Sequence, residues 1–262
     1  MNMSFYSAAV GAYQQQLRMN VQANNIANVN THGFKAEKVT FGELMNRDVV
    51  GINDENLPKG TGARVIQATV DFAPNGLTET GRAFDFAING DGFFGLFDPS
   101  NGEIYFTRDG AFTMAQFWVE PDEEAIAAAE EAGEEAQPVA VWRLSDNEGR
   151  CVLDPEGNFI VIDPEEIREG SRLDVEVSLG VFDYAIHEGM VHVDSSRFSP
   201  TDRNGQLYLG TGVVKRGYLE MSNTDLALEF VKVIESQRAY SYCLRMVTTS
   251  DEIETTINGL RG

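Results

Sequence analysis

A few residue groups in this chain have the types that metal, calcium or phosphate sites use. His187 and His192 stand five residues apart, whereas a zinc-binding helix places two histidines four apart on one face. Residues 146–149 and 154–158 are rich in Asp, Asn and Gly, but they lack the ligand spacing and closing Glu of a calcium loop, so we interpret them as turns. Residues 90–92 read Gly-Asp-Gly without the Lys-Ser/Thr of a phosphate loop. We therefore expect no catalytic, cofactor-binding or metal site.

The chain has 262 residues, with 42% hydrophobic residues and 41 Asp plus Glu against 20 Lys plus Arg. Its net charge of -21 repels nucleic acid and anionic membranes, so neither is expected as a partner. Two cysteines, Cys151 and Cys243, are too few for a disulfide framework, and we interpret both as packed thiols. No apolar run is long enough to cross a membrane, and the first residues lack the pattern of a cleaved signal. The sequence favours a cytoplasmic protein or one exported without a cleaved signal.

Apolar residues near the N-terminus follow helical spacing in two stripes. The first has the alternating three- and four-residue steps of a coiled-coil seam: Phe5, Ala8, Ala12, Gln15, Met19, Gln22, Ile26 and Val29. The second runs beside it: Tyr6, Val10, Tyr13 and Leu17. Ser4 is the expected N-cap, and Gly33 can adopt the positive φ of a helix stop. This pattern predicts a helix that ends within residues 28–33.

The C-terminal end repeats the pattern over a longer stretch. Its predicted seam is Leu226, Phe230, Val233, Gln237, Tyr240, Leu244 and Val247, and the apolar stripe then drifts to Met246, Ile253, Ile257 and Leu260. The sequence predicts a helix of more than about 30 residues, far longer than the average globular helix.

Between the two helices the apolar residues alternate, and Asn-Gly pairs mark turns. The expected strands are short and lie around residues 84–88, 93–97, 104–107, 151–153, 159–162 and 173–182. Frequent turns favour antiparallel hairpins. Residues 120–137 break the pattern with eight acids and no base. We interpret this run as a solvated excursion from a hairpin, with a docking surface for a basic partner as the alternative.

The two helical ends are expected to pair, because an isolated helix of this kind is at best marginal in water. One partner helix can cover only one of the two N-terminal stripes. The second stripe then faces either the middle domain or another copy of the chain, and a repeated head-to-tail contact between copies would build a ring or a filament.

Four segments together carry a family resemblance. Residues 23–35 read Ala-Asn-Asn-Ile-Ala-Asn-Val-Asn-Thr-His-Gly-Phe-Lys, and residues 217–225, continued at 235–240, read Gly-Tyr-Leu-Glu-Met-Ser-Asn-Thr-Asp and Glu-Ser-Gln-Arg-Ala-Tyr. Residues 87–94 and 105–112 supply two central motifs. In their order along the chain, these segments closely resemble those of bacterial flagellar rod and hook proteins, and the resemblance covers nearly the whole chain.

The resemblance implies a structural protein of the flagellar basal body that is exported through the flagellar type III apparatus without a cleaved signal. It implies an α+β fold in which the terminal helices pair as a coiled coil and polymerise into a tubular drive shaft that transmits torque to the hook. The expected partners are further copies, other rod and hook proteins, and the export apparatus. Residues 60–65, ahead of Asn75-Gly76, most resemble the distal rod members. A proximal rod or hook-type member is the alternative within the family, and a secreted β-rich binding module is the alternative outside it.

The expected domains are residues 1–34 plus 216–262 as the helical coiled-coil domain, 35–80 as an extended connection, and 81–215 as a β-rich outer domain. Residues 114–142 look like an acidic insertion relative to the family. The clustered asparagines could bond backbone across a subunit boundary or cap the helix locally. Gln237 could fix the register of a seam, and Arg238 could pair with a carboxylate of a neighbouring subunit. The predicted assembly interface comprises Phe5, Tyr6, Tyr13, Leu17, Met19, Asn24, Asn25, Ile26, Asn28, Asn30, Leu226, Phe230, Val233, Gln237, Arg238, Tyr240 and Leu244.

Overall fold

The computed structural model describes residues 3–43, 47–50, 56–59, 63–119, 139–162, 177–194 and 196–260. The chain forms two compact units. The helical unit comprises Met1–Asn30, Lys35–Phe72 and Asn223–Gly262, and the β unit comprises Thr31–Phe34 and Ala73–Ser222. The predicted acidic run at 120–137 lies outside the described residues. The three-part domain division drawn from the sequence stays a prediction.

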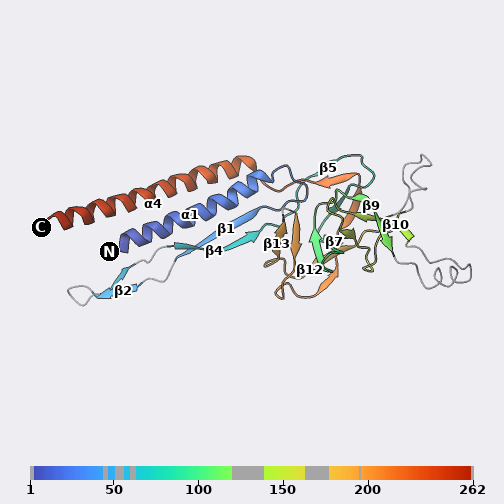
Figure 1. Ribbon diagram of the computed structural model, residues 1–262, viewed down its shortest axis with the longest axis horizontal. Coiled ribbons are helices and arrows are strands. Elements are labelled where there is room, and N and C mark those ends of the chain that lie inside the picture. Colours follow the sequence, from blue (N-terminus) through green and yellow to red (C-terminus); the bar gives the residue numbers. More distant parts are fainter. Residues whose placement is uncertain are drawn as a thin grey trace, which may run out of the picture. The chain divides into compact units, whose positions relative to one another are not determined.

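Two long antiparallel helices dominate the helical unit, α1 (Met3–Ala27) and α4 (Leu226–Leu260). The hydroxyls of Ser4 and Ser250 lie 3.3 Å apart, and Ser236 Oγ donates to Gln22 Oε1 at 3.1 Å. These pairs run in opposite directions along the two helices, so both chain ends lie at the same end of the unit (Figure 1). The predicted packing of the two terminal helices on each other is confirmed.

A β ladder flanks α1 on the side away from α4 (Figure 1). Strand β1 (Glu37–Glu43) pairs antiparallel with β4 (Ala63–Val70), with a bulge between Thr40 and Phe41, and β2 (Arg47–Val50) pairs with β3 (Asn56–Lys59). The Val65 amide donates to Gln14 Oε1 at 2.7 Å, and the Arg18 guanidinium lies 5.7 Å from the centre of the Phe41 ring. The middle layer of the helical unit is therefore α1.

An antiparallel sheet of nine strands forms most of the β unit. Its main path runs β13-β14-β8-β7-β11-β10-β9, and β12 pairs with both β7 and β15. The bounds are β7 (Phe93–Phe97), β8 (Ile104–Thr107), β9 (Thr113–Val119), β10 (Val139–Ser145), β11 (Cys151–Val152), β12 (Val181–Tyr184), β13 (Val191–Asp194), β14 (Arg197–Ser199) and β15 (Leu207–Leu209). Two small ladders complete the unit: β5 (Leu77–Glu79) with β17 (Tyr218–Glu220), and β6 (Phe86–Asn89) with β16 (Val213–Arg216). Every pairing is antiparallel, as the sequence predicts.

Aromatic and branched aliphatic side chains fill the core of the β unit. Phe94, Leu144 and Val152 are fully enclosed, and Phe94 meets Phe112 edge to face at 5.3 Å between ring centres. Burying side chains of this size contributes about 1.5–3 kcal/mol each. The β unit therefore holds a core built from its own chain.

The chain bends between the predicted strands at 84–88 and 93–97, but these two strands do not pair with each other as a hairpin. Strand β6 before this bend pairs with β16, whereas β7 after it pairs with β8, β11 and β12. Gly92 has φ of 120°, and a Cβ there would lie 2.5 Å from a methyl group of Val181. The turn thus serves close packing between ladders, which local alternation cannot reveal. Residues 159–162, predicted as a strand, contribute only isolated bridges at Phe159 and Val161.

Candidate assembly interface

Small and polar side chains make the contact between α1 and α4. The buried residues of α4 are Glu229, Ser236 and Ser250, and Cys243 continues the same seven-residue spacing. A Cβ placed on Gly11 of α1 would lie 3.3 Å from the Cys243 sulfur. Because Gly11, Ser236, Cys243 and Ser250 are small, the two helix backbones can approach closely at these positions.

The predicted seam on α1 is mostly covered within the chain, whereas the predicted seam on α4 is covered only in part. On α1, Ala12 is buried and Met19 and Ile26 are half-buried. On α4, Val233, Tyr240 and Val247 are half-buried and Gln237 is exposed, while Leu226, Phe230 and Leu244 remain 40%, 50% and 42% exposed. The predicted α4 seam is therefore only partly covered within the chain. Val233, Tyr240 and Val247 are half-buried beside residues 229, 236, 243 and 250, whereas Leu226, Phe230 and Leu244 turn outward.

Most of the second stripe of α1 is also exposed. Tyr6, Val10 and Tyr13 are 50%, 40% and 58% exposed, whereas Leu17 is half-buried. Phe5, from the first stripe, packs edge to face on Tyr6 and is itself 36% exposed. Tyr6, Val10 and Tyr13 thus give α1 a largely exposed apolar surface.

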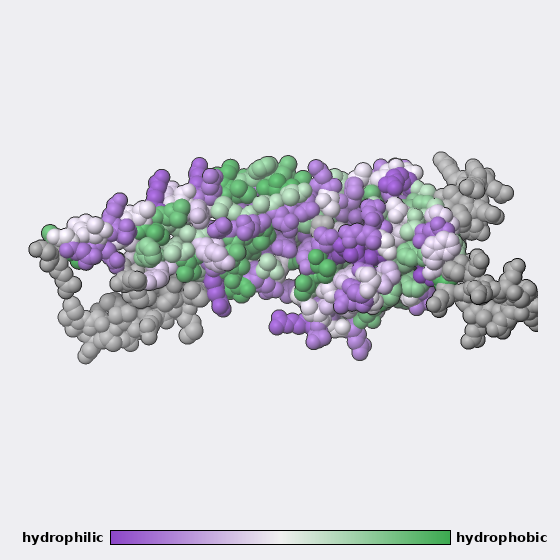
Figure 2. Space-filling view, in the orientation of Figure 1, coloured by the Kyte–Doolittle hydropathy of each residue, from purple (hydrophilic) through white to green (hydrophobic). Residues whose placement is uncertain are grey.

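Two apolar stripes are exposed along α4, one on each side of its contact with α1. One stripe holds Leu226, Phe230, Ile234 and Leu244. The other, called here the distal stripe, holds Leu228, Val231, Tyr242, Met246, Ile253, Ile257 and Leu260, and every one of these is at least 48% exposed. Figure 2 shows apolar side chains gathered over the N-terminal half of α4. Exposed apolar patches of this extent mark interaction surfaces.

Several asparagines of the family motifs form hydrogen bonds with backbone groups of the same chain. Asn25 is 1% exposed and bonds the Glu37 backbone twice, donating from Nδ2 to the carbonyl at 2.9 Å and accepting the amide at 3.0 Å. Asn28 Nδ2 donates to both the backbone carbonyl and the side-chain oxygen of Asn24. Asn223 likewise accepts from the Ala36 amide and donates to the Asp71 carbonyl. Asn28 bonds locally at the end of α1, whereas Asn25 ties the helix end to the start of β1, and Asn24 and Asn30 are exposed.

A buried ion pair that sequence reasoning missed organises one end of the β unit. Arg108 and Glu220 are 3% and 1% exposed, and Arg108 donates to Glu220 Oε2 at 3.2 Å and to the Gly90 carbonyl at 2.9 Å. Glu220 Oε1 accepts the Asn75 amide, and the Glu220 carbonyl accepts the Gly33 amide. Both charged residues stand inside the family motifs, so their place in those motifs was the available signal. The pair fixes the chain segments around residues 33, 75 and 220 together.

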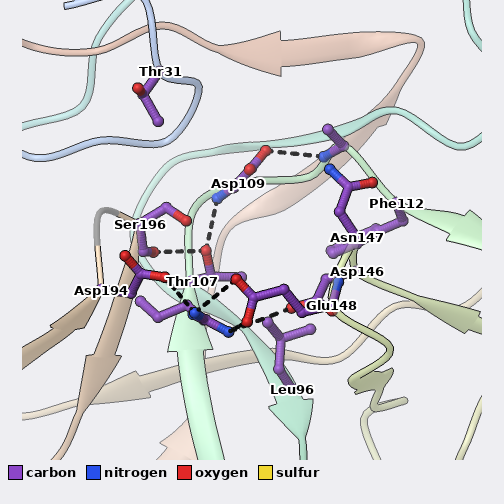
Figure 3. A pocket seen from close by; sticks show the side chains of 12 residues that line it. Thr31, Leu96, Thr107, Asp109, Phe112, Asp146, Asn147, Glu148, Asp194 and Ser196 are labelled. Atoms are coloured by element: carbon purple, nitrogen blue, oxygen red, sulfur yellow. Dashed lines mark hydrogen bonds and ion pairs between the residues drawn. The ribbon is translucent and has the colours of Figure 1, made fainter. Parts of the chain in front are cut away.

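Several charged side chains line a polar pocket of about 170 Å³ in the β unit (Figure 3). Arg197 pairs there with Asp194 and Glu148, and Arg150 bridges Asp98, Asp146 and Glu148 nearby. Within the described ranges, no cluster of His, Cys, Asp and Glu has the arrangement of a metal site. The acids are thus engaged by arginines, and the arrangement stabilises loops.

Burial raises the pKa of Asp109, which lines the same pocket and accepts the Ala111 amide. The carboxylates of Asp146 and Asp85 add to that rise in pKa. The protonated form of Asp109 is therefore favoured more than in a free carboxyl group.

The histidines, acidic turns and cysteine that the sequence analysis considered as possible site residues make contacts that support the fold. His187 Nε2 lies 2.6 Å from Asp183, whereas His192 packs on the Phe198 ring. The carboxylates of Asp146 and Asp154 each accept two amides of the turn that follows them, which confirms the interpretation of these segments as turns. Cys151 is buried, and burial raises the pKa of its thiol. Neither described helix has an apolar stretch sufficient to traverse a bilayer.

Comparison with known proteins assigns the segments that carry the resemblance. Residues 5–35 match the family model described as flagella basal body rod protein, and residues 215–260 match the flagellar basal body rod FlgEFG protein C-terminal model. Residues 87–118 match the flagellar hook protein FlgE/F/G D1 domain.

Curated relatives match over most of their length. Flagellar basal-body rod protein FlgG of Buchnera aphidicola subsp. Baizongia pistaciae is 30% identical, over 95% of this chain and 96% of the relative. FlgG of Bacillus subtilis is 28% identical over the same shares. Flagellar basal-body rod protein FlgF of Caulobacter vibrioides is 31% identical over 90% of this chain and 88% of the relative. The resemblance drawn from the sequence motifs is confirmed.

Proposed function

Because the chain belongs to the family of flagellar basal-body rod proteins, we propose that it builds the rod by self-association through its two terminal helices. The exposed apolar stripes on α1 and α4 are the observation that carries this proposal. The chain is a structural protein of the flagellar basal body, and its family is one of rod proteins.

Burial of the stripes between copies supplies the driving force. Removing apolar surface from water contributes about 25 cal/mol for each Å². Phe230, Tyr242 and Ile253 each leave about half of their surface in water within the single chain. Contacts that repeat along a polar filament bury the same surfaces on every copy, so the free energy of assembly accumulates over many subunits.

The assembled helices form a coiled coil in this proposal, with α1 and α4 of one copy packed against helices of its neighbours. The interface residues predicted from the sequence are retained, and the distal stripe of α4 is added to them. Asn25 stays in the set as a positioning residue, because both ends of its amide already bond the backbone of Glu37.

The proposal also covers place and partners. The subunit contributes to the distal rod, contacts other rod and hook proteins, and reaches its site through the flagellar export apparatus. FlgG relatives at about 30% identity support the distal position. The β unit, with its own core, forms the outer part, and residues 114–142 carry the extra acidic segment.

Polymerisation of the purified full chain tests the proposal. Tyr13→Ser and Ile253→Ser each remove an exposed apolar side chain, so we expect sedimentable polymer to fall sharply while the circular dichroism of the monomer is unchanged. The matched control is Trp118→Ser, which removes an apolar side chain 69% exposed on β9 of the β unit. Polymer yields equal to wild type in both helix variants would contradict the proposal. Deletion of residues 1–29 should abolish polymer and leave the β unit folded.

A further inference from the structure

The exposed side of α1 carries no charge. Arg18 is the only charged residue among residues 3–27, and it is half-buried, with its guanidinium 3.8 Å from Glu235. The exposed positions from Phe5 to Ala27, called here the uncharged face of α1, hold only Phe, Tyr, Val, Ala, Gln and Asn. A helix that faces water normally carries charged residues on its polar side. The uncharged face is therefore suited to a contact that excludes water.

The seam predicted on α4 is uncharged over a similar length. It runs through residues 226–247 in three- and four-residue steps, every position is apolar except Gln237, and charge returns at the next step, Asp251. These positions are called here the seam face. Phe230 and Leu244 of this face are 50% and 42% exposed within the chain. At 1.5 Å per residue, the seam face spans about 32 Å and the uncharged face of α1 about 33 Å.

The distal stripe of α4 is a poorer match for an uncharged partner. Glu235 stands four residues after Val231 and seven before Tyr242, so it lies within the distal stripe. Its side chain is 62% exposed in the single chain. A helix laid over the distal stripe would take this carboxylate out of water, and the cost of its desolvation opposes binding. The seam face offers apolar side chains without a charge to bury.

Large side chains alternate with small ones on the uncharged face. Tyr6 and Tyr13 are seven residues apart and 50% and 58% exposed, and the exposed Ala9 stands between them. Ala23 and Ala27 continue the exposed side with further small residues. Alternation of this kind lets the side chains of two helices interdigitate as knobs into holes. A tyrosine ring can also enter such a contact and keep its hydroxyl hydrogen-bonded.

A polymer requires each copy to offer two different surfaces. A face that packs on the same face of a second copy makes an isologous contact, which closes as a dimer. The uncharged face and the seam face belong to different helices, so one copy can present one of them to each of two neighbours. A contact between these two faces is therefore heterologous and can repeat along a filament.

We propose that the uncharged face of α1 in one copy packs on the seam face of α4 in a neighbouring copy. This contact rests on the proposed function, because it is one of the contacts of the polymer. Each copy presents α1 to one neighbour and receives α1 of another on its own α4.

A charge placed on either face tests the contact in the purified full chain. Tyr13→Glu and Phe230→Glu each put a carboxylate into the proposed contact, so each should raise the critical concentration for polymerisation about tenfold or more. Both side chains are at least 50% exposed, so the helix content of the monomer should not change. The charge-matched control is Trp118→Glu, at a side chain 69% exposed on β9, which should polymerise like wild type. A helix variant that assembles like this control would overturn the proposal.

A mixture of the two helix variants shows whether the contact joins different surfaces. Tyr13→Glu chains keep an intact seam face, and Phe230→Glu chains keep an intact uncharged face. Each variant alone should stay monomeric, whereas the mixture should form a 1:1 complex in sedimentation equilibrium that cannot extend further. A mixture that remains monomeric would overturn the proposal. A complex that forms with Ile253→Glu but not with Phe230→Glu would also overturn it, because the α1 face would then lie on the distal stripe.

Two further measurements separate this contact from folding and from the proposed function. Tyr13→Ser and Phe230→Ser should give the same result in the mixture, which excludes an effect of the added charge on the helices. A wild-type chain that forms no polymer would contradict the proposed function, and this contact with it. A wild-type chain that polymerises, with variants that do not complement each other, would overturn this contact alone.

Discussion

The two units of this chain place their apolar side chains in opposite ways. In the β unit, Phe93, Phe94, Phe106, Phe112 and Phe198 are all less than 2% exposed. In α4 of the helical unit, the buried residues are Glu229, Ser236 and Ser250, while Phe230, Ile234 and Tyr242 stand half-exposed or more. The β unit completes its core within one chain, whereas the helical unit leaves apolar side chains exposed, which is the surface that the proposed assembly would cover.

Polar groups show the same division. The β unit encloses the Arg108–Glu220 pair, in which each charge is neutralised inside the fold. On α4, Arg238 and Arg245 are in water, and short polar side chains occupy the contact with α1. The β unit therefore pairs its buried charges inside its own fold, whereas the described arginines at 238 and 245 of α4 remain on the surface.

A Phe→Ala substitution in each unit tests this contrast between the two units. Phe94→Ala leaves a cavity in an enclosed core and should lower the free energy of unfolding by about 3–5 kcal/mol. Phe230→Ala, at a side chain 50% exposed, should change the unfolding of the monomer by less than about 1 kcal/mol and weaken polymerisation instead. Urea unfolding followed by Trp fluorescence and by circular dichroism measures both effects. Equal losses of monomer stability would refute the contrast.

The buried ion pair of the β unit gives the next effect in size. Arg108→Met leaves Glu220 buried without its partner and should destabilise the β unit by about 3 kcal/mol. Adding Glu220→Met should recover part of the loss, because no charge is then left buried. Arg203→Met, at an exposed arginine of the β unit, is the control and should be nearly neutral. Equal effects at Arg108 and Arg203 would show that the pair does not matter.

Because α1 and α4 approach closely at Gly11, a larger side chain at this position should lower the stability of the helical unit. Gly11→Leu places a large side chain where a Cβ already lies 3.3 Å from the Cys243 sulfur, so we expect a loss of about 1–3 kcal/mol in helical-unit stability. Ala9→Leu, at an exposed position on α1, is the matched control. Thermal unfolding at 222 nm reports the helices. A tolerated Gly11→Leu would mean that the small residues do not set the α1–α4 distance.

The smallest expected effect is a pH dependence at Asp109. Burial raises the pKa of this carboxyl above its ordinary value, so the folded chain holds the proton more tightly than the unfolded chain does. Stability from this group is therefore lost as pH rises from about 4 through the raised pKa. Asp109→Asn should remove that loss and gain on wild type as the pH increases, while it keeps an acceptor for the Ala111 amide. Parallel stability–pH curves for the two proteins would contradict the prediction.

Much of the fold could be predicted from local patterns. The three- and four-residue steps of Phe5, Ala12 and Met19 and the long C-terminal repeat predicted both helices, and alternation with Asn-Gly turns predicted an antiparallel middle. The motifs at 23–35 and 217–225 identified the family without any contact information. These features depend on residues close together in the chain, which periodicity reports directly.

The arrangement of contacts was beyond the sequence. Of the predicted apolar seam on α4, Val233, Tyr240 and Val247 are half-buried, but Leu226, Phe230 and Leu244 are exposed. Ser236 and Cys243, which no apolar pattern marks, approach α1 instead. Apolar periodicity shows that a surface will be buried, but it does not say by which molecule. The Arg108–Glu220 pair joins residues 112 apart, and no local signal couples them.

The sequence by itself determined two long terminal helices, a β-rich middle and membership of a rod family, because spacing and motif are written along the chain. Only the tertiary structure decided which helix faces turn inward. That choice depends on how closely two backbones can approach, and Gly11 and Cys243 allow a close approach. The apolar stripes left outside are the surfaces from which a polymer of this protein would be built.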